Sequence, residues 1–332
     1  MEITIRMPDD MHLHLRQGRT LKQVLPWTAN QFARAVVMPN TIPPITTARL
    51  LEDYRNEIKQ AGPDFEPLMV FKIMADMDSA RIRELKKAGA AAGKLYPRGS
   101  TTNAQDGPSE ISKLYPVFTA MQENGLILCI HAEDPKIAVL EREQAFLPVI
   151  GEIAENFPGL KIIVEHVSTK EAVEFVKNSG ENISATVTLH HLLFTLDDLI
   201  GGKLDADLFC KPVIKQEADR ESIRQAVFSG NSKFFFGSDS APHSKTKKLE
   251  EGSAGIFSAP VIMPMLALLF EENKKLNLLD NFVSGFGADF YGLQKNKKLL
   301  ILEKQISEVP EKVGEIVPVF AGKVLDWRVR KE

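Results

Sequence analysis

Runs of apolar, mostly β-branched residues recur along the chain, and a stretch with helical periodicity follows nearly every run. Eight runs are present, at residues 11–15, 34–40, 67–75, 91–97, 126–133, 161–167, 183–191 and 233–240. Several are hydrophobic throughout instead of alternating with polar residues, which is typical of parallel strands covered on both faces. We therefore expect eight buried parallel strands.

The stretches between these runs carry the start and stop signals of helices. Residues 46–62 open on two threonines and end at Gly62, which predicts an amphipathic helix between them. Residues 79–89 and 168–180 have the same form. Strands that alternate with helices predict βαβ units, and eight units predict a closed (β/α)8 barrel, the TIM barrel. An open, doubly wound sheet is the alternative, but no glycine-rich dinucleotide-binding motif follows an early strand.

The pattern continues without a break in composition, so we expect a single barrel domain over residues 1–332. The strongly apolar residues 257–275 predict a helix packed on the barrel. The chain becomes lysine-rich after Leu293, and we expect a short C-terminal appendage from about residue 294.

Composition and charge narrow the class of function. The chain has 332 residues, 44% of them hydrophobic, and a formal net charge of −3, as is ordinary for a globular protein. This charge argues against nucleic acid as the main partner. Two cysteines cannot form a disulfide framework, no apolar signal segment opens the chain, and no run is long enough for a membrane helix. We therefore expect a cytoplasmic protein with no membrane contact.

His12 and His14 alternate with Leu13 and Leu15 in the first apolar run. Side chains at i and i+2 of a strand lie on the same face, so both imidazoles point one way and both leucines the other. Taken alone, this pair is equally consistent with two hydrogen-bonded histidines at a strand end and with part of a functional site. The remaining polar residues have to decide between the two interpretations.

The other histidines also fall at, or just beyond, the ends of predicted strands, together with several other polar residues. They are His131, His166, His190, His191 and His243, with Asn40, Lys94 and Asp239. The active site of a (β/α)8 barrel lies at the carboxyl ends of its strands. Imidazoles that converge there with a carboxylate form a metal site, for which we expect zinc, with manganese, cobalt and iron as alternatives.

Lys94 follows a run of small apolar residues inside a predicted strand. Most lysines are solvated, and burial of one is costly. A buried lysine has a lowered pKa and a neutral, nucleophilic amine. Such an amine can react with CO₂ to form a carbamate, which is an anionic ligand with two oxygens. A solvated lysine and a metal-bridging carbamate are therefore the two interpretations of Lys94.

Six motifs together identify a family resemblance over nearly the full length of the chain. They are PDDMHLHLRQG (8–18), VVMPNTIPP (36–44), GKLYPRGSTTN (93–103), IHAE (130–133), VEHVSTK (164–170) and GSDSAPH (237–243). With them the chain resembles the shorter bacterial dihydroorotases of the amidohydrolase superfamily. The HxH pair alone marks only the superfamily.

The resemblance implies a site with two zinc ions per subunit. His12, His14 and Asp239 would bind the more buried ion, and His131 and His166 would bind the other. Lys94, carboxylated by CO₂ to N6-carboxylysine, would bridge both ions.

The resemblance also implies a set of substrate-binding residues. Arg16, Asn40 and His243 would hold the substrate carboxylate, and Thr101 and Thr102 would close over the ligand. A guanidinium suits this role because it can grip a carboxylate with two parallel hydrogen bonds. The backbone around Ala254 and Gly255 would contact the substrate, as would that of Lys211, which here stands in place of an apolar residue. Residues 244–252 lack the cysteines of some relatives, and we assign this segment no metal role.

The implied reaction is the reversible ring closure of N-carbamoyl-L-aspartate to L-dihydroorotate and water, in de novo pyrimidine (UMP) biosynthesis. For ring opening, a hydroxide that bridges the two metals would attack the ring, with Asp239 as general base and acid. By analogy with the family, we expect a homodimer.

Two other functions remain open at the level of the sequence. A hydantoinase-like or allantoinase-like cyclic amidohydrolase would share the metal ligands, and a catalytically inactive barrel would serve as a scaffold. Arg16, Asn40 and His243 favour a substrate with a carboxylate, and no ligand position is missing. We expect Cys129 to be a buried small hydrophobe. Strand alternation would turn only one of His190 and His191 inward, in a packing or supporting role.

Overall fold

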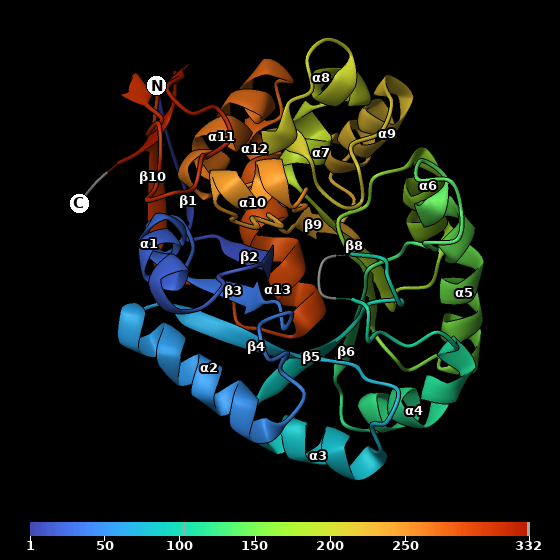
Figure 1. The fold of residues 1–332 in the computed structure, drawn as a ribbon. Helices are drawn as coiled ribbons and strands as arrows, with labels where there is room; N and C mark the ends of the chain where they lie inside the picture. The colour runs from blue at the N-terminus through green and yellow to red at the C-terminus, as the bar shows by residue number, and fades with distance from the viewer. Residues whose placement is uncertain (102–103, 331–332) are drawn as a thin grey trace.

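The computed structural model describes residues 1–101 and 104–330, and its centre is a parallel barrel (Figure 1). The eight strands are hydrogen-bonded in chain order, and all pairs are parallel. They are β2 (Asp9–Leu13), β3 (Arg34–Val37), β4 (Glu66–Lys72), β5 (Ala90–Leu95), β6 (Ile127–Ile130), β7 (Ile162–Val164), β8 (Ile183–Val187) and β9 (Phe234–Phe236). This confirms the predicted (β/α)8 barrel, although most strands are shorter than the apolar runs that predicted them.

The sheet closes where β2 meets the segment after β9. A parallel bridge joins Leu13 to Ser240, and His14 donates its backbone N–H to the Ser240 carbonyl at 3.1 Å. Asp239 in turn donates its backbone N–H to the His12 carbonyl at 2.8 Å. Closure of the barrel therefore brings Asp239 beside the two histidines, although more than two hundred residues separate them in sequence.

Helices surround the barrel (Figure 1). The α-helices are α1 (Gly18–Ala29), α2 (Ala48–Ala61), α3 (Ser79–Lys87), α4 (Tyr115–Glu123), α5 (Arg142–Asn156), α6 (Lys170–Asn178), α7 (Leu189–Leu193), α8 (Leu196–Ile200), α9 (Glu217–Phe228), α10 (Lys245–Glu250), α11 (Ile262–Glu272), α12 (Leu276–Asp280) and α13 (Phe286–Tyr291). Short helices are η1 (Ile111–Leu114), η2 (Ala206–Leu208), η3 (Ala259–Val261) and the π-helix η4 (Asn281–Gly285).

The predicted helix boundaries hold where capping residues fix them. Thr47 accepts a hydrogen bond from the backbone N–H of Leu50 at the start of α2, and Gly62 follows its end. Thr169 caps α6 in the same way. Each cap satisfies a backbone donor that has no partner inside the helix, and so sets the helix start.

Alternation along the strands separates two apolar cores. Met11, Val70, Cys129 and Phe235 belong to the core inside the barrel, whereas Leu13 belongs to the larger core between the strands and the helices. The burial of Cys129 is as predicted. The inner core fills the barrel below the carboxyl ends of the strands. The polar residues at those ends therefore lie directly above packed apolar side chains.

The two ends of the described chain meet in a sheet that the sequence did not predict. β1 (Glu2–Arg6) pairs antiparallel with β10 (Leu299–Glu303), which also pairs with β13 (Arg328–Val329). β11 (Ser307–Glu308) and β12 (Val324–Leu325) form a second small sheet. Residues beyond 294, predicted as an appendage, therefore include the central strand that pairs with the N-terminal one.

A membrane-spanning helix was not expected, and the described residues contain none that is long and apolar enough for one.

Candidate active site

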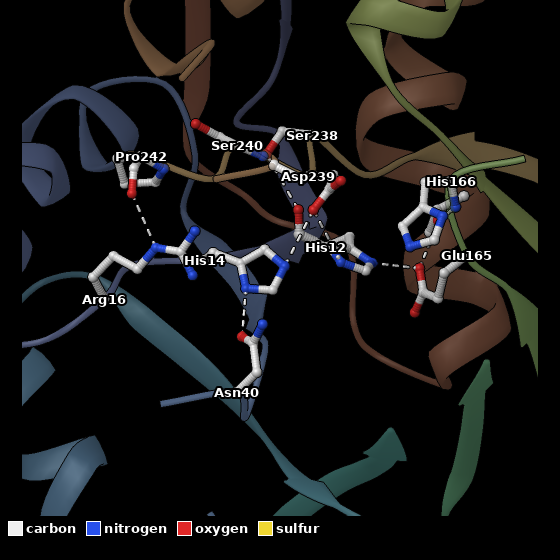
Figure 2. Close-up of polar contacts among 12 residues, drawn as sticks. His12, His14, Arg16, Asn40, Glu165, His166, Ser238, Asp239, Ser240 and Pro242 are labelled. Carbon is white, nitrogen blue, oxygen red and sulfur yellow. Dashed lines mark hydrogen bonds and ion pairs between the residues drawn. The ribbon is translucent and has the colours of Figure 1, made fainter. Parts of the chain in front are cut away.

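Three predicted metal ligands meet at the mouth of the barrel (Figure 2). His12 Nε2 lies 3.4 Å and His14 Nε2 3.1 Å from Asp239 Oδ1. One ligand atom from each residue lies within 4.8 Å of the other two, and all three side chains are buried. This spacing and this donor set can hold one metal ion.

The other three predicted ligands lie next to this group. The ring of His166 lies 5.0 Å from that of His12 and 4.8 Å from that of His131, measured between centroids. Lys94 is fully buried, and among the described residues neither its Nζ nor Nδ1 of His166 has a hydrogen-bond partner. Buried polar atoms are rarely left unpaired, so these orphaned atoms fit a ligand that the protein is built to hold.

The protonation states also suit metal binding. Burial lowers the pKa of His14 to about 4 and that of His166 well below its usual value, so both rings are neutral near pH 7. Burial alone would raise the pKa of Asp239, but a hydrogen bond with His14 and the nearby imidazoles hold that pKa below its usual range. Neutral imidazoles and an ionised carboxylate are the ligand forms of these side chains.

Burial also lowers the pKa of Lys94, despite the opposing charge of Glu165. On β5, Lys94 is the register partner of Cys129 and lies above Ala92 of the inner core. Burial here shifts the equilibrium of Lys94 from the charged ammonium toward the neutral amine. The neutral amine is the form that can react with CO₂.

Acceptor groups fix which nitrogen of His12 and of His14 faces the site. His12 donates from Nδ1 to Glu165 Oε2 at 2.7 Å, and His14 donates from Nδ1 to Asn40 Oδ1 at 2.7 Å (Figure 2). Neither acceptor oxygen can donate, so Nδ1 of each ring carries a proton, and Nε2 is the nitrogen that faces Asp239. Glu165 was missed by the sequence analysis, although it directly precedes His166, and Asn40 orients a histidine as well as lining the pocket.

Glu165 accepts hydrogen bonds from both His12 and Thr186, the latter at 2.6 Å, and its orienting role can be tested by substitution. We expect Glu165→Gln to weaken metal binding by about 10- to 100-fold, the usual effect of losing such a supporting carboxylate. Metal titration of the metal-free protein measures this effect. The exposed Glu174→Gln is the matched control, and equal metal affinity of the two variants would contradict the orienting role.

Three residues of the site have a backbone conformation that is unusual for a side chain with a Cβ. The φ angles are 60° for Arg16, 45° for His166 and 45° for Asp239. Such strain persists only where the surroundings enforce it, and it concentrates at functional sites. Its occurrence at three predicted site residues supports their assignment to one site.

Arg16 and His243 form the other end of the site. Arg16 donates from Nε to the Pro242 carbonyl at 3.0 Å, and its Nη2 lies 2.8 Å from His243 Nε2. Burial, followed by the charge of Arg16, lowers the pKa of His243 to about 3. The neutral ring can therefore accept from the guanidinium, which stays available to an anion.

One pocket contains most of the residues predicted from sequence. It is lined by His12, His14, Arg16, Asn40, Tyr96, Thr101, His131, His166, Lys211, Asp239, Ala241, Ala254 and Gly255. At Gly255, φ is 148°, and a Cβ would come within 2.5 Å of the Ala241 carbonyl oxygen, so glycine permits this close approach. Thr102 lies outside the described residues.

The predicted placement of His190 and His191 on a strand was wrong. They lie on helix α7 and not on a strand, since Thr188 caps this helix by accepting from the backbone N–H of His191. Both side chains are buried. His191 contacts Thr188 and the Pro212 carbonyl, which gives it a packing role, and with Cys210 the two histidines form a second buried group of potential ligand atoms.

Comparison with known proteins identifies the family of this chain. Residues 10–181 match the Amidohydrolase family. The chain is 42% identical to a dihydroorotase of Pseudoalteromonas atlantica, with 99% of each chain covered. Dihydroorotase structures from Saccharomyces cerevisiae, in complex with 5-fluoroorotic acid, and from Campylobacter jejuni each superpose with a TM-score of 0.93. Their identities are 35% and 39%, over 99% of this chain and 98% of theirs.

These dihydroorotases match this chain from end to end, not only at its motifs. The resemblance inferred from the six motifs is thus confirmed. The chain belongs to the dihydroorotase family of amidohydrolases.

Proposed function

We propose that this protein interconverts N-carbamoyl-L-aspartate and L-dihydroorotate, the ring-closing step of pyrimidine synthesis. The observation that carries the proposal is the convergence of five potential metal ligands and Arg16 on one pocket, with Lys94 buried near His131 and His166. The ligands suit hydrolysis or formation of an amide, and the guanidinium suits a substrate with a carboxylate. The yeast relative binds 5-fluoroorotic acid, a pyrimidine carboxylate of similar shape.

The donor set fits two zinc ions. His12, His14 and Asp239 would hold one ion, His131 and His166 the other, and a carbamate on Lys94 would contact both. When bound, such a pair of ions lowers the pKa of a water molecule toward about 7 and polarises a carbonyl oxygen.

The carbamate is proposed because it would convert Lys94, a buried lysine whose burial is costly, into a metal ligand. A neutral amine at Lys94 attacks CO₂, the new N–C bond forms, and one proton leaves to solvent. The product carries a negative charge and two oxygens where the unmodified side chain has a buried, unpaired Nζ. A buried charge is tolerated when it is paired with metal ions.

Asp239 is proposed to move the proton. Its Oδ1 faces His12 and His14, and Oδ2 is left for this task. In ring closure the carboxylate accepts a proton from the ureido nitrogen, and in ring opening it returns that proton to the departing amide nitrogen. Its low pKa keeps it ionised at neutral pH, ready to accept a proton.

Arg16 is proposed to bind the α-carboxylate of the substrate, with Asn40 and His243 beside it. Thr101, Thr102, Lys211, Ala254 and Gly255 are proposed to contact the rest of the ligand. Two buried free cysteines agree with a cytoplasmic location. A homodimer is carried over from the family, and sedimentation of the purified protein tests it.

We expect Arg16→Lys to raise KM for L-dihydroorotate by about 10-fold or more, because an ammonium cannot reproduce a two-point contact with a carboxylate. Steady-state kinetics measure this effect. Metal content should stay at the wild-type level, and unchanged KM would remove Arg16 from substrate binding.

Metal analysis combined with an assay on three substrates tests the proposed function. The protein should turn over L-dihydroorotate far faster than hydantoin or allantoin, because these two lack the carboxylate that Arg16 would bind. Faster turnover of either one would favour a hydantoinase-like or allantoinase-like enzyme. A protein without bound metal, and inactive after zinc and bicarbonate are supplied, would instead be a scaffold.

A further inference from the structure

One buried lysine joins two segments of the pocket wall. Lys248 of α10 is only 6% exposed. Its Nζ donates to the carbonyl oxygens of Gly255 at 2.6 Å, Phe209 at 3.0 Å and Asp207 at 3.4 Å. Gly255 lines the pocket. Phe209 lies two residues before Lys211, which also lines the pocket. No role is assigned to Lys248 by the reaction proposed above.

The two segments also contact each other directly. The backbone N–H of Gly255 donates to the Phe209 carbonyl at 2.9 Å. The carbonyls of both residues are thus held by the Lys248 ammonium, and its three N–H groups match three acceptors. Charge-assisted hydrogen bonds of this kind are stronger than neutral ones. The ammonium and the hydrogen bond between Gly255 and Phe209 therefore form one small network that links the two segments of the pocket wall.

The burial of Lys248 is not explained by α10 itself. Ser244 already caps this helix by accepting from the backbone N–H of Lys247, and Lys245 and Lys247 are exposed. Burial lowers the pKa of Lys248 to about 8, against the opposing effects of Cys210, Asp207 and Asp205, so the ammonium remains the main form at neutral pH. A buried cation is costly unless its hydrogen bonds are satisfied, and here the backbone of the pocket wall satisfies them.

The same wall reaches the substrate-binding end of the site. The carbonyl of Ala254, which precedes Gly255, lies 3.1 Å from His243 Nε2, and that nitrogen lies 2.8 Å from Arg16 Nη2. A shift of the Gly255 segment would therefore disturb the Ala254 backbone and the His243–Arg16 contact together.

We propose that Lys248 is a positioning residue, whose ammonium holds the Phe209 and Gly255 peptide groups in the arrangement that binds the substrate. This inference rests on the proposed function, because the affected quantity is affinity for the dihydroorotase substrate. Without the ammonium, the wall populates other arrangements, and apparent affinity falls with the fraction that remains competent. The metal ligands come from other segments and keep their places.

The test compares full-length Lys248→Met with Lys247→Met, a control on the exposed face of the same helix. We expect KM for L-dihydroorotate to rise by about 10-fold or more in Lys248→Met, because buried acceptors lose their donor. Both kcat and metal content should stay near the control values, as expected when only binding is weakened. Lys248→Arg, which keeps the charge but not the compact geometry, should give a smaller rise.

Amide hydrogen exchange provides a readout that does not depend on activity. Exchange at residues 209–211 and 253–256 should be faster in Lys248→Met than in Lys247→Met. If the wild type fails to turn over L-dihydroorotate, the proposed function falls, while exchange still decides whether Lys248 holds the wall. If Lys248→Met does not fold, the same measurements on Lys248→Arg decide. Unchanged KM and unchanged exchange in the folded variant, or a loss of metal and kcat at constant KM, would overturn the inference.

Discussion

Lys94→Ala is expected to lose both the metal content and the activity of the wild type while remaining folded. The side chain is fully buried at the end of β5, near His131 and His166, which the proposal assigns to the same two-metal site. Removing a ligand shared by two metals should cost more than the roughly 10- to 100-fold that follows loss of a supporting residue. Metal analysis after dialysis and the dihydroorotate assay measure the two losses.

The carbamate itself can be separated from the lysine that carries it. A short carboxylic acid such as propionate, added to Lys94→Ala, should restore part of the metal content and activity, because it places two oxygens in the vacated space. Wild-type protein stripped of metal and CO₂ should recover with zinc only when bicarbonate is present. Full activity of Lys94→Ala without added acid would refute the carbamate.

Lys72 offers a matched control for these measurements. It is the register partner of Lys94 on β4 and is equally buried, but it forms an ion pair with Asp106. Lys72→Met also removes a buried lysine from this layer of the barrel, and it should keep the metals. If Lys72→Met loses metal to the same extent, the effect of Lys94→Ala reflects general damage to the barrel mouth and not a lost ligand.

The parts of the site that follow from local pattern were predictable from sequence. Alternation placed His12 and His14 on one face, and the barrel rule placed Asp239 near them, because the carboxyl ends of all eight strands meet. Glu165 was not predictable as the partner of His12, since this contact depends on how strands far apart in the chain face each other across the barrel. Lys248 was hidden for a similar reason: its acceptors are backbone carbonyls, which leave no trace in the sequence.

The same distinction holds for the fold. The eight barrel strands are recognisable in the sequence as apolar runs, because both faces of each strand are covered. β1 does not, since Glu2–Arg6 becomes a strand only by pairing with Leu299–Glu303 at the other end of the chain. His190 and His191 were misplaced because the apolar run continues past the end of β8, and only the cap at Thr188 marks the change to a helix.

Asp239→Asn is expected to retain the fold and to lower kcat by about 10²- to 10⁴-fold, the usual contribution of a general acid–base group. The amide keeps the size of the carboxylate but cannot accept a proton at neutral pH, and it is a weaker metal ligand. Loss of the proton acceptor lowers kcat, and weaker coordination lowers metal affinity. Assays at saturating zinc separate the two, because excess metal compensates for weak binding but not for the missing base.

Asp10→Asn is the matched control for this variant. Asp10 is a buried carboxylate on β2, and its Oδ1 accepts from the backbone N–H groups of His12 and Ser238 at 3.1 Å and 2.8 Å. An asparagine oxygen can accept the same two bonds, so kcat should stay within about three-fold of the wild type, the range expected where no transition-state contact is removed. If Asp239→Asn at saturating zinc matched Asp10→Asn in kcat, Asp239 would be a metal ligand alone, and the proton would have to move through another group at the pocket.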